Sequence, residues 1–142
     1  MDWITLERLD NGIEPKMADY LVDTDILIDI SKGNKAAMLF LSNLENVNIS
    51  IITSMELIVG AKNNAEINEI EKFLQRFNII SVDNEICSFA YGLLKRHALS
   101  YGLTIPDSLI AATAIINNFN LATKNVKHFR LIKNLNLKIP EY

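Results

Sequence analysis

The 142-residue sequence contains a single cysteine, Cys87, and this scarcity excludes several kinds of site. One cysteine cannot form an intramolecular disulfide, and it cannot supply the thiolate cluster of a structural zinc site. Cys87 also lies in a pattern typical of a helix, which does not favour a catalytic thiol. The low cysteine content fits a reducing compartment.

Long apolar runs and signal-peptide features are also absent. No stretch reaches the roughly 18 apolar residues that a membrane-spanning helix needs. The first residues, MDWITLERLDNG, are acidic rather than basic, unlike a signal peptide. We therefore expect a cytoplasmic protein. The sequence has no glycine-rich phosphate loop, and His97 and His128 show no zinc-ligand spacing.

The net charge of −3 is distributed unevenly along the chain. Residues 1–94 carry 15 acidic and 7 basic side chains, whereas residues 95–142 carry 2 acidic and 7 basic ones. If the fold brings the two sets together, an acidic pocket acquires a basic rim. Such a site suits a polyanionic substrate that binds through a metal ion. Chance clustering on a solvated surface is the alternative.

The apolar pattern predicts one domain, residues 17–142, after an extension of uncertain role at residues 1–16. Short apolar or β-branched runs predict strands, and apolar residues at helical spacing predict helices. Their alternation predicts a three-layer α/β/α sandwich with a central parallel sheet of four to five strands. We expect strands near 20–23, 47–52, 78–82, 120–123 and 136–140, and helices near 25–33, 35–44, 53–60, 65–77, 105–118 and from Asp83 or Asn84 onward.

Four oxygen-bearing side chains lie near the predicted carboxyl ends of strands or the starts of helices. Asp23 ends the first strand, Glu56 follows the second, Asn125 follows the fourth, and Asp107 begins a helix. Ligands bind beyond the carboxyl ends of the strands in open parallel sheets. Carboxylate and amide oxygens suit Mg²⁺ or Mn²⁺. The sequence therefore predicts a divalent metal site there.

Most of these residues also have a purely structural interpretation. Thr53 and Glu56 fit a capping box, Asp107 fits the positive end of a helix dipole, and Asn125 fits a helix N-cap. Asp23 has no comparable role at the end of a buried strand, because a buried charge is costly unless it is paired or binds a metal. Its presence favours function over capping.

The segments YLVDTDILID, ITSMELIVGA, LTIPDSLIAATAI and LATKNVKHF resemble the successive motifs of PIN-domain ribonucleases, particularly VapC-type toxins. The resemblance runs from about Tyr20 to Ile139. It implies a small α/β/α sandwich, and a metal-binding and catalytic set formed by Asp23, Glu56 and Asp107. The fourth family position, often Asp, falls on or near Asn125, whose amide is a weaker metal ligand.

The same resemblance implies Mg²⁺- or Mn²⁺-dependent cleavage of RNA, a cognate antitoxin as partner, and a homodimer. Thr24 and Thr123 match supporting hydroxyl positions near the site, and Asp25 stands where Asn is common. The basic residues beside the last motif are candidates for binding RNA phosphates. They are Lys124, Lys127 and Arg130.

Two other functions remain open at this point. A haloacid-dehalogenase-type phosphatase uses a DxD motif after a strand, with Asp23 as nucleophile and Asp25 as acid/base. Leu27 and the lack of a downstream acidic pair argue against it. A catalytically degenerate PIN-like binding module, with the acids serving as caps, is the non-enzymatic alternative. Asp29, one helical turn after Asp25, is expected to be a solvated helix acid.

Overall fold

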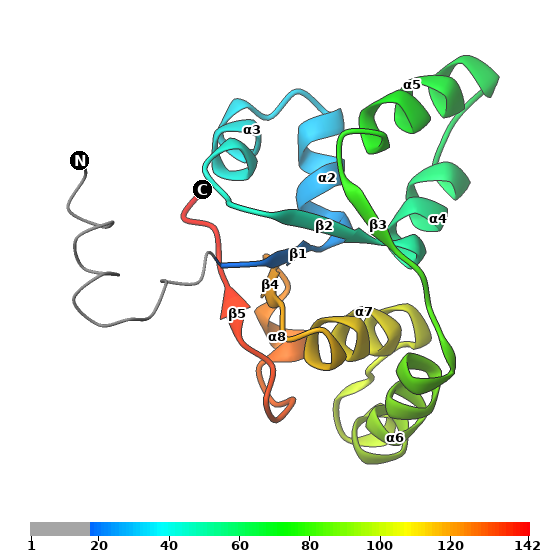
Figure 1. Cartoon of the computed structure of the whole chain (residues 1–142), viewed down its shortest axis with the longest axis vertical. Helices are drawn as coiled ribbons and strands as arrows, with labels where there is room; N and C mark the ends of the chain where they lie inside the picture. Colours follow the sequence, from blue (N-terminus) through cyan, green and yellow to red (C-terminus); the bar gives the residue numbers. More distant parts are fainter. Residues whose placement is uncertain (1–17) are drawn as a thin grey trace, which may run out of the picture.

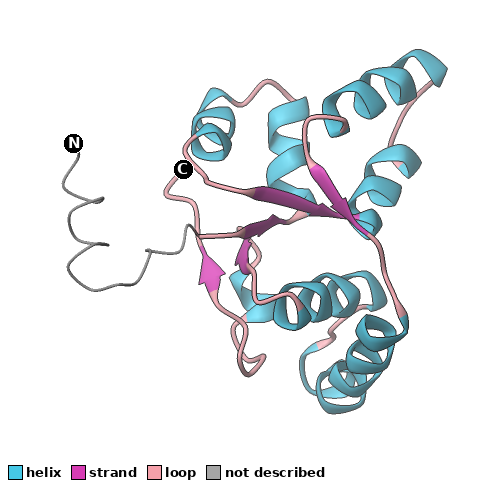
Figure 2. Ribbon diagram, viewed as in Figure 1, coloured by secondary structure: helices cyan, strands magenta, loops and turns pink. Residues whose placement is uncertain are grey.

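The structure, a computed structural model, describes residues 18–142, so the predicted extension at 1–16 lies outside the described residues. All strands run parallel in one sheet of order β3-β2-β1-β4-β5, and helices cover both faces (Figures 1 and 2). This confirms the predicted α/β/α sandwich. The strands are β1 (Tyr20–Val22), β2 (Val47–Ser50), β3 (Asn78–Ile80), β4 (Asn120–Ala122) and β5 (Leu137–Lys138). The helices are α2 (Thr24–Ser31), α3 (Lys35–Ser42), α4 (Ile51–Val59), α5 (Asn64–Leu74), α6 (Asn84–Tyr101), α7 (Ile105–Ile116) and α8 (Val126–Phe129).

The two central strands bury side chains on both faces of the sheet. Leu21 of β1 and Leu121 of β4 pack into a cluster with residues of α6, α7 and α8. Val22 and Ala122, their neighbours in sequence, point the other way into a cluster with residues of α2 and α5. Successive side chains of a strand alternate between faces, so a continuous apolar run fits a sheet covered on both sides.

One boundary differs from the prediction in a way that matters for the site. The sequence run VNISII predicts a strand through Ile52, but β2 ends at Ser50 and α4 begins at Ile51. The Ser50 hydroxyl accepts a hydrogen bond from the Ile52 N–H at 3.1 Å, so Ser50 is the N-cap. This local hydrogen bond outweighs the β-propensity of the two isoleucines. Thr53 therefore lies inside the helix.

A tight connection between α6 and α7 positions Asp107. Gly102 ends α6 in the left-handed conformation, at φ 74°, which glycine adopts without steric cost. The Thr104 hydroxyl then caps α7 by accepting from the Asp107 N–H at 3.3 Å. Asp107 consequently occupies the first turn of α7, as the sequence predicts.

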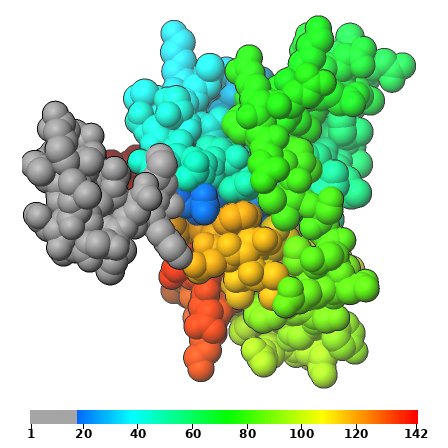
Figure 3. Space-filling view, in the orientation of Figure 1, coloured from blue at the N-terminus to red at the C-terminus, as the bar shows by residue number. Residues whose placement is uncertain are grey.

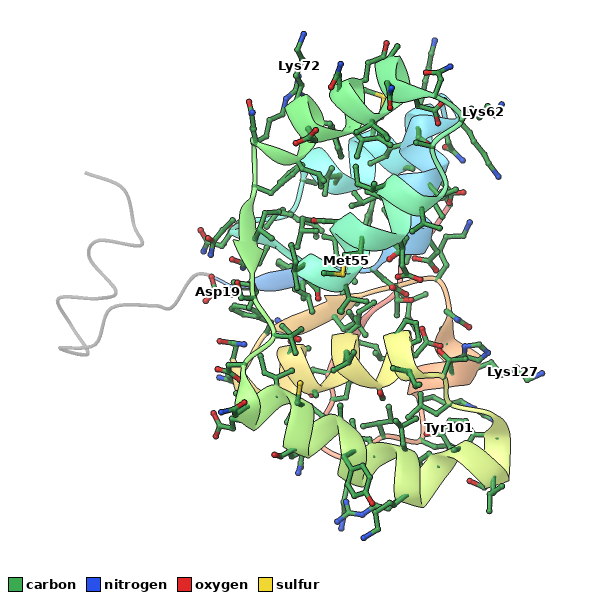
Figure 4. The ribbon with its side chains drawn as sticks, turned by 90° about the vertical axis from the view of Figure 1, so that its right-hand side faces the viewer. Asp19, Met55, Lys62, Lys72, Tyr101 and Lys127 are labelled. Carbon is green, nitrogen blue, oxygen red and sulfur yellow. The ribbon has the colours of Figure 1, made fainter. Side chains whose placement is uncertain are left out.

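The carboxyl ends of β1 and β2 point toward the flank of Figure 1 that faces the viewer in Figure 4. On this flank Lys62 lies on one side of the sheet and Lys127 on the other (Figure 4). The edge strand β3 lies at the surface of the face shown in Figure 3. Within residues 18–142, none of the helices has the length and apolar character needed to cross a bilayer.

Candidate active site

Asp23 is the central carboxylate of the candidate site. It follows β1 directly, is only 5% exposed, and occupies the N-cap position of α2. Its Oδ1 accepts a hydrogen bond from the Thr24 N–H at 2.8 Å. The expectation that Asp23 lacks a structural role is therefore wrong, because the strand passes into the helix without an intervening loop. The cap uses Oδ1 and leaves Oδ2 for other contacts.

Thr123 ties the end of β4 to the end of β1. Its fully buried hydroxyl donates to Asp23 Oδ2 at 2.7 Å and lies 3.5 Å from Asp25 Oδ2. The same oxygen accepts from the Asn125 N–H at 2.9 Å. Because β1 and β4 are neighbouring parallel strands, both ends meet although the residues are 100 positions apart in sequence. Thr123 therefore lies beside Asp23, near the site, as the family resemblance implies.

Glu56 reaches the same region from α4. The Thr24 hydroxyl donates to Glu56 Oε1 at 2.7 Å and lies 3.0 Å from the hydroxyl of the buried Thr53. Since Thr24 has one hydroxyl hydrogen, Thr53 donates to Thr24. Glu56 and Thr53 do not form a capping box, because Ser50 is the N-cap of α4. Thr24 therefore orients Glu56, and Thr53 supports Thr24 rather than capping the helix.

Asp107 contacts His128, whose spacing in the sequence matches no zinc site. The Nδ1 atom of His128 lies 2.8 Å from Asp107 Oδ2 and 2.9 Å from the amide of Asn125. A carboxylate only accepts, so the Nδ1 hydrogen points toward Asp107. Asn125 occupies the N-cap position of α8 but makes no capping hydrogen bond with its side chain. Asn125 and His128 are three positions apart at the start of α8, and this spacing is the sequence feature that indicates their proximity.

The carboxylates near Asp23 influence one another electrostatically. Burial, together with the charges of Asp25 and then Asp107, raises the pKa of Asp23 to about 7. Burial also raises the pKa of Asp25, although the Lys124 N–H opposes this by donating to Asp25 Oδ2 at 3.0 Å. The other oxygen, Asp25 Oδ1, is buried and has no hydrogen-bond partner. A proton, an ordered water or a bound cation satisfies a buried oxygen of this kind.

The side chains of the site fit a divalent cation in their chemistry, but they are not grouped closely enough to enclose one. The available donors are oxygens, which Mg²⁺ and Mn²⁺ prefer, and one of them is buried and unpaired. In the part of the chain that the structure describes, no three His, Cys, Asp or Glu side chains group closely enough to hold a metal ion. Asp23, Glu56 and Asp107 therefore approach one another from three elements but do not form a closed ligand set.

The predicted RNA-binding residues fall into two kinds. Lys127 and Arg130 lie on and just after α8 with exposed side chains. Lys124 is different, because its ammonium group pairs with Asp29 Oδ2 at 2.6 Å. The expectation that Asp29 is simply solvated is therefore wrong: its side chain is only 20% exposed and is hydrogen-bonded.

We predict that Lys127 and Arg130 strengthen RNA binding through phosphate contacts. The double alanine variant should bind RNA more weakly whatever the RNA sequence. The slope of log K against log salt concentration should become less steep by about 1.4 if both residues contact single-stranded phosphates. Binding assays over a salt series measure this slope. Lys35→Ala with Lys72→Ala removes the same charge elsewhere, and Lys72 lies far from Lys127 in Figure 4. Equal slopes in the two double variants would contradict the assignment.

A hollow beside the site runs between α2, α4 and α5. Its apolar wall is flanked by charges of both signs, and Glu56 forms part of its lining. A molecule bound in the hollow would consequently lie against one of the candidate catalytic residues. The lining residues used below are Leu27, Ile28, Leu57, Ile70 and Phe73, with Lys32, Lys62, Glu56, Glu66 and Glu69.

Comparisons with known proteins show the family of the chain. The family model for the PIN domain matches residues 20–134. Ribonuclease VapC1 of Methanocaldococcus jannaschii is 36% identical over 136 residues, covering 94% of this chain and 96% of that protein. A toxin–antitoxin complex from Klebsiella pneumoniae contains a chain that is 35% identical, with a TM-score of 0.72 over 82% of this chain and 95% of that one. VapBC2 from Rickettsia felis, bound to a promoter DNA fragment, gives 30% identity and a TM-score of 0.66 over 84% and 97%. The chain belongs to the PIN domain family.

Proposed function

We propose that this protein is a divalent-metal-dependent endoribonuclease and the toxin of a toxin–antitoxin pair. The observation that carries the proposal is the buried Asp23 at the carboxyl end of a parallel sheet. Asp25 and Asp107 lie near enough to raise its pKa, and Glu56 is linked to the neighbouring Thr24 by a hydrogen bond. Its relatives are named ribonucleases and occur in toxin–antitoxin complexes. The family assignment removes the support for the dehalogenase-type phosphatase.

Asp23, Glu56 and Asp107 would hold Mg²⁺ or Mn²⁺, with Asn125 near the same end of the sheet. When bound, such an ion lowers the pKa of water and neutralises charge on the phosphate. Thr123 and Thr24 fix one oxygen each of Asp23 and Glu56, and His128 fixes one oxygen of Asp107. Hydrolysis then consists of attack by a water oxygen on phosphorus and departure of a ribose oxygen. The chain contributes the positions of the acids around that phosphate.

Metal dependence is the direct test of this proposal. EDTA should abolish cleavage of RNA, and excess Mg²⁺ or Mn²⁺ should restore it, because the candidate ligands are all oxygens. Asp107→Asn should remain inactive after the metal is restored. Mapping of RNA 5′ ends after inducible expression of the wild type or of Asp107→Asn measures cleavage inside cells. Full activity in EDTA would contradict the metal mechanism, whereas RNA binding without cleavage would favour the degenerate binding module.

We propose that the hollow between α2, α4 and α5 is the binding site for a segment of the antitoxin. Its apolar wall suits an amphipathic segment, its charged rim offers ion pairs of both signs, and its contact with Glu56 lets the occupant reach the site. An antitoxin bound there would block the catalytic acids directly. The homodimer implied by the sequence resemblance remains a prediction.

We predict that Ile28→Glu weakens antitoxin binding by at least about 10-fold, because a buried unpaired charge costs more than 1.4 kcal/mol. Ile28 is 38% exposed in the free protein, so the fold should tolerate the change. Titration calorimetry with the cognate antitoxin measures the affinity. Leu99→Glu, at a fully exposed position on α6, is the matched control. Equal antitoxin affinities in the two variants would place the antitoxin elsewhere.

A further inference from the structure

Three residues from distant parts of the chain meet beside the candidate site. Asp29 Oδ2 accepts hydrogen bonds from Lys124 Nζ at 2.6 Å and from the Tyr142 hydroxyl at 2.8 Å. The Lys124 ammonium also lies 5.2 Å from the centre of the Tyr142 ring, within range of a cation–π interaction. We call Asp29, Lys124 and Tyr142 the Asp29 cluster. It joins α2, the segment after β4 and the segment after β5.

The Asp29 cluster is connected to the site through the backbone of Lys124. The Lys124 N–H donates to Asp25 Oδ2 at 3.0 Å, and the preceding residue, Thr123, donates to Asp23 Oδ2 at 2.7 Å. Asp25 and Asp29 lie one turn apart on α2, so they face the same segment after β4. Thr123 and Lys124 therefore form hydrogen bonds with two carboxylates of the site, Asp23 and Asp25. The side chain of Lys124 in turn anchors this dipeptide to Asp29 and Tyr142.

The Asp29 cluster contributes little to the stability of the fold. The side chains of Lys124 and Asp29 are 40% and 20% exposed, and ion pairs at such partly exposed positions contribute about 0–1 kcal/mol. The cluster matters more for the geometry of the site, because the hydrogen-bond partners of metal-binding residues set the orientation of those residues. Loss of such partners typically weakens metal affinity or activity about 10- to 100-fold.

We propose that Asp29 and Tyr142 are positioning residues of the site. They fix the side chain of Lys124, and through it the two hydrogen bonds that orient Asp25 and Asp23. Lys124 then serves the carboxylates rather than an RNA phosphate. This inference rests on the proposed metal-dependent nuclease function and adds to it a role for the segment that follows β5.

The test compares Tyr142→Phe, Asp29→Ala and Lys124→Met in the full chain. Asp29→Ala should weaken Mn²⁺ binding, followed by electron paramagnetic resonance, by roughly 10-fold. It should lower kcat by a similar factor while KM for RNA stays constant. Lys124→Met should match it, and Tyr142→Phe, which keeps the ring but loses the hydroxyl, should show a smaller loss in the same direction. Melting temperatures confirm that each variant is folded.

Matched controls and a double variant complete the design. Tyr91→Phe and Lys133→Met make the same chemical changes at exposed positions away from the cluster and should behave like the wild type. Asp29→Ala combined with Lys124→Met should be no worse than either single variant, because both remove the same contact. Additive losses, or a higher KM with unchanged kcat and Mn²⁺ affinity, would overturn the inference and return Lys124 to the RNA interface.

The Mn²⁺ measurement needs no RNA, so it separates this inference from the proposed function. A wild type that binds Mn²⁺ but cleaves no RNA would contradict the nuclease proposal and still allow the variants to be compared. A wild type that cleaves RNA, with variants equal to it in kcat and Mn²⁺ affinity, would overturn the positioning role alone. A wild type without Mn²⁺ affinity would overturn both.

Discussion

Asp23→Asn should abolish RNA cleavage and, in the metal-free protein, raise the free energy of unfolding above pH 7. The loss of cleavage follows from removing the charge that the metal requires. The gain in stability follows from the environment of Asp23, which is only 5% exposed and lies near the charges of Asp25 and Asp107. Asparagine is uncharged, so it avoids the cost of burying an ion there.

The pH range of the effect follows from the pKa of Asp23, which is raised from 3.8 to about 7 on folding. Between these values the folded protein binds a proton that the unfolded chain does not. The free energy of unfolding therefore falls as pH rises from about 4 to about 7, and levels off above that. A pKa difference of this size corresponds to at most about 4 kcal/mol. Asp23→Asn should remove most of this pH dependence.

The hydrogen bonds of Asp23 can survive the substitution. The asparagine carbonyl can still accept from the Thr24 N–H, and its amide can donate to the Thr123 hydroxyl, which has two acceptor lone pairs. Denaturant unfolding in EDTA at pH 5 and pH 8 measures the difference between the two proteins. A variant that is less stable than the wild type at pH 8 would show that the charge of Asp23 is compensated within the protein.

Asp25→Asn provides the companion measurement. After burial, the charge of Asp25 is the main cause of the raised pKa of Asp23, so its removal should lower that pKa and shift the onset of activity toward lower pH. Cleavage should be largely retained, since an asparagine carbonyl can also accept from the Lys124 N–H. Near-complete loss of cleavage would instead show that the charge of Asp25 is itself required at the site.

Local patterns predicted the sheet and most of the helices because each depends on nearby residues. Leu21 and Val22 form a continuous apolar run, and β1 is indeed buried on both faces. The rule that parallel strands share one carboxyl end predicts that Asp23 and Asn125, which follow β1 and β4, lie at the same edge of the sheet. Both predictions depend only on the periodicity of apolar residues and on the common direction of the strands in a parallel sheet.

The contacts between side chains could not be predicted in the same way. The hydrogen bond of Tyr142 to Asp29 spans 113 positions, and nothing near either residue indicates the other. The sequence spacing of His128 suits no zinc site and indicates no other role, yet α8 places this residue against Asp107. The start of α4 was misplaced because Ile51 and Ile52 favour a strand, while the cap at Ser50 favours a helix.

Glu56→Gln should leave the protein folded and reduce cleavage by at least about 100-fold, equivalent to roughly 3 kcal/mol of transition-state stabilisation. The glutamine carbonyl is the same size as the carboxylate and can still accept from the Thr24 hydroxyl, which now binds Glu56 Oε1 at 2.7 Å. Only the charge is lost, so the melting temperature should stay nearly constant. Single-turnover cleavage of RNA with saturating Mg²⁺ measures the chemical step.

Thr53→Ala is the converse control for Glu56→Gln. Thr53 is fully buried inside α4 and donates to Thr24, so its loss removes a buried hydrogen bond rather than a helix cap. Stability should fall by about 1–3 kcal/mol, while Thr24 can still donate to Glu56 and preserve much of the activity. Opposite patterns in the two variants, one stable and inactive, the other less stable and active, would establish the carboxylate of Glu56 as catalytic. A well-folded Glu56→Gln protein with normal cleavage would reduce Glu56 to a partner of Thr24 and leave Asp23 and Asp107 as the acids of the site.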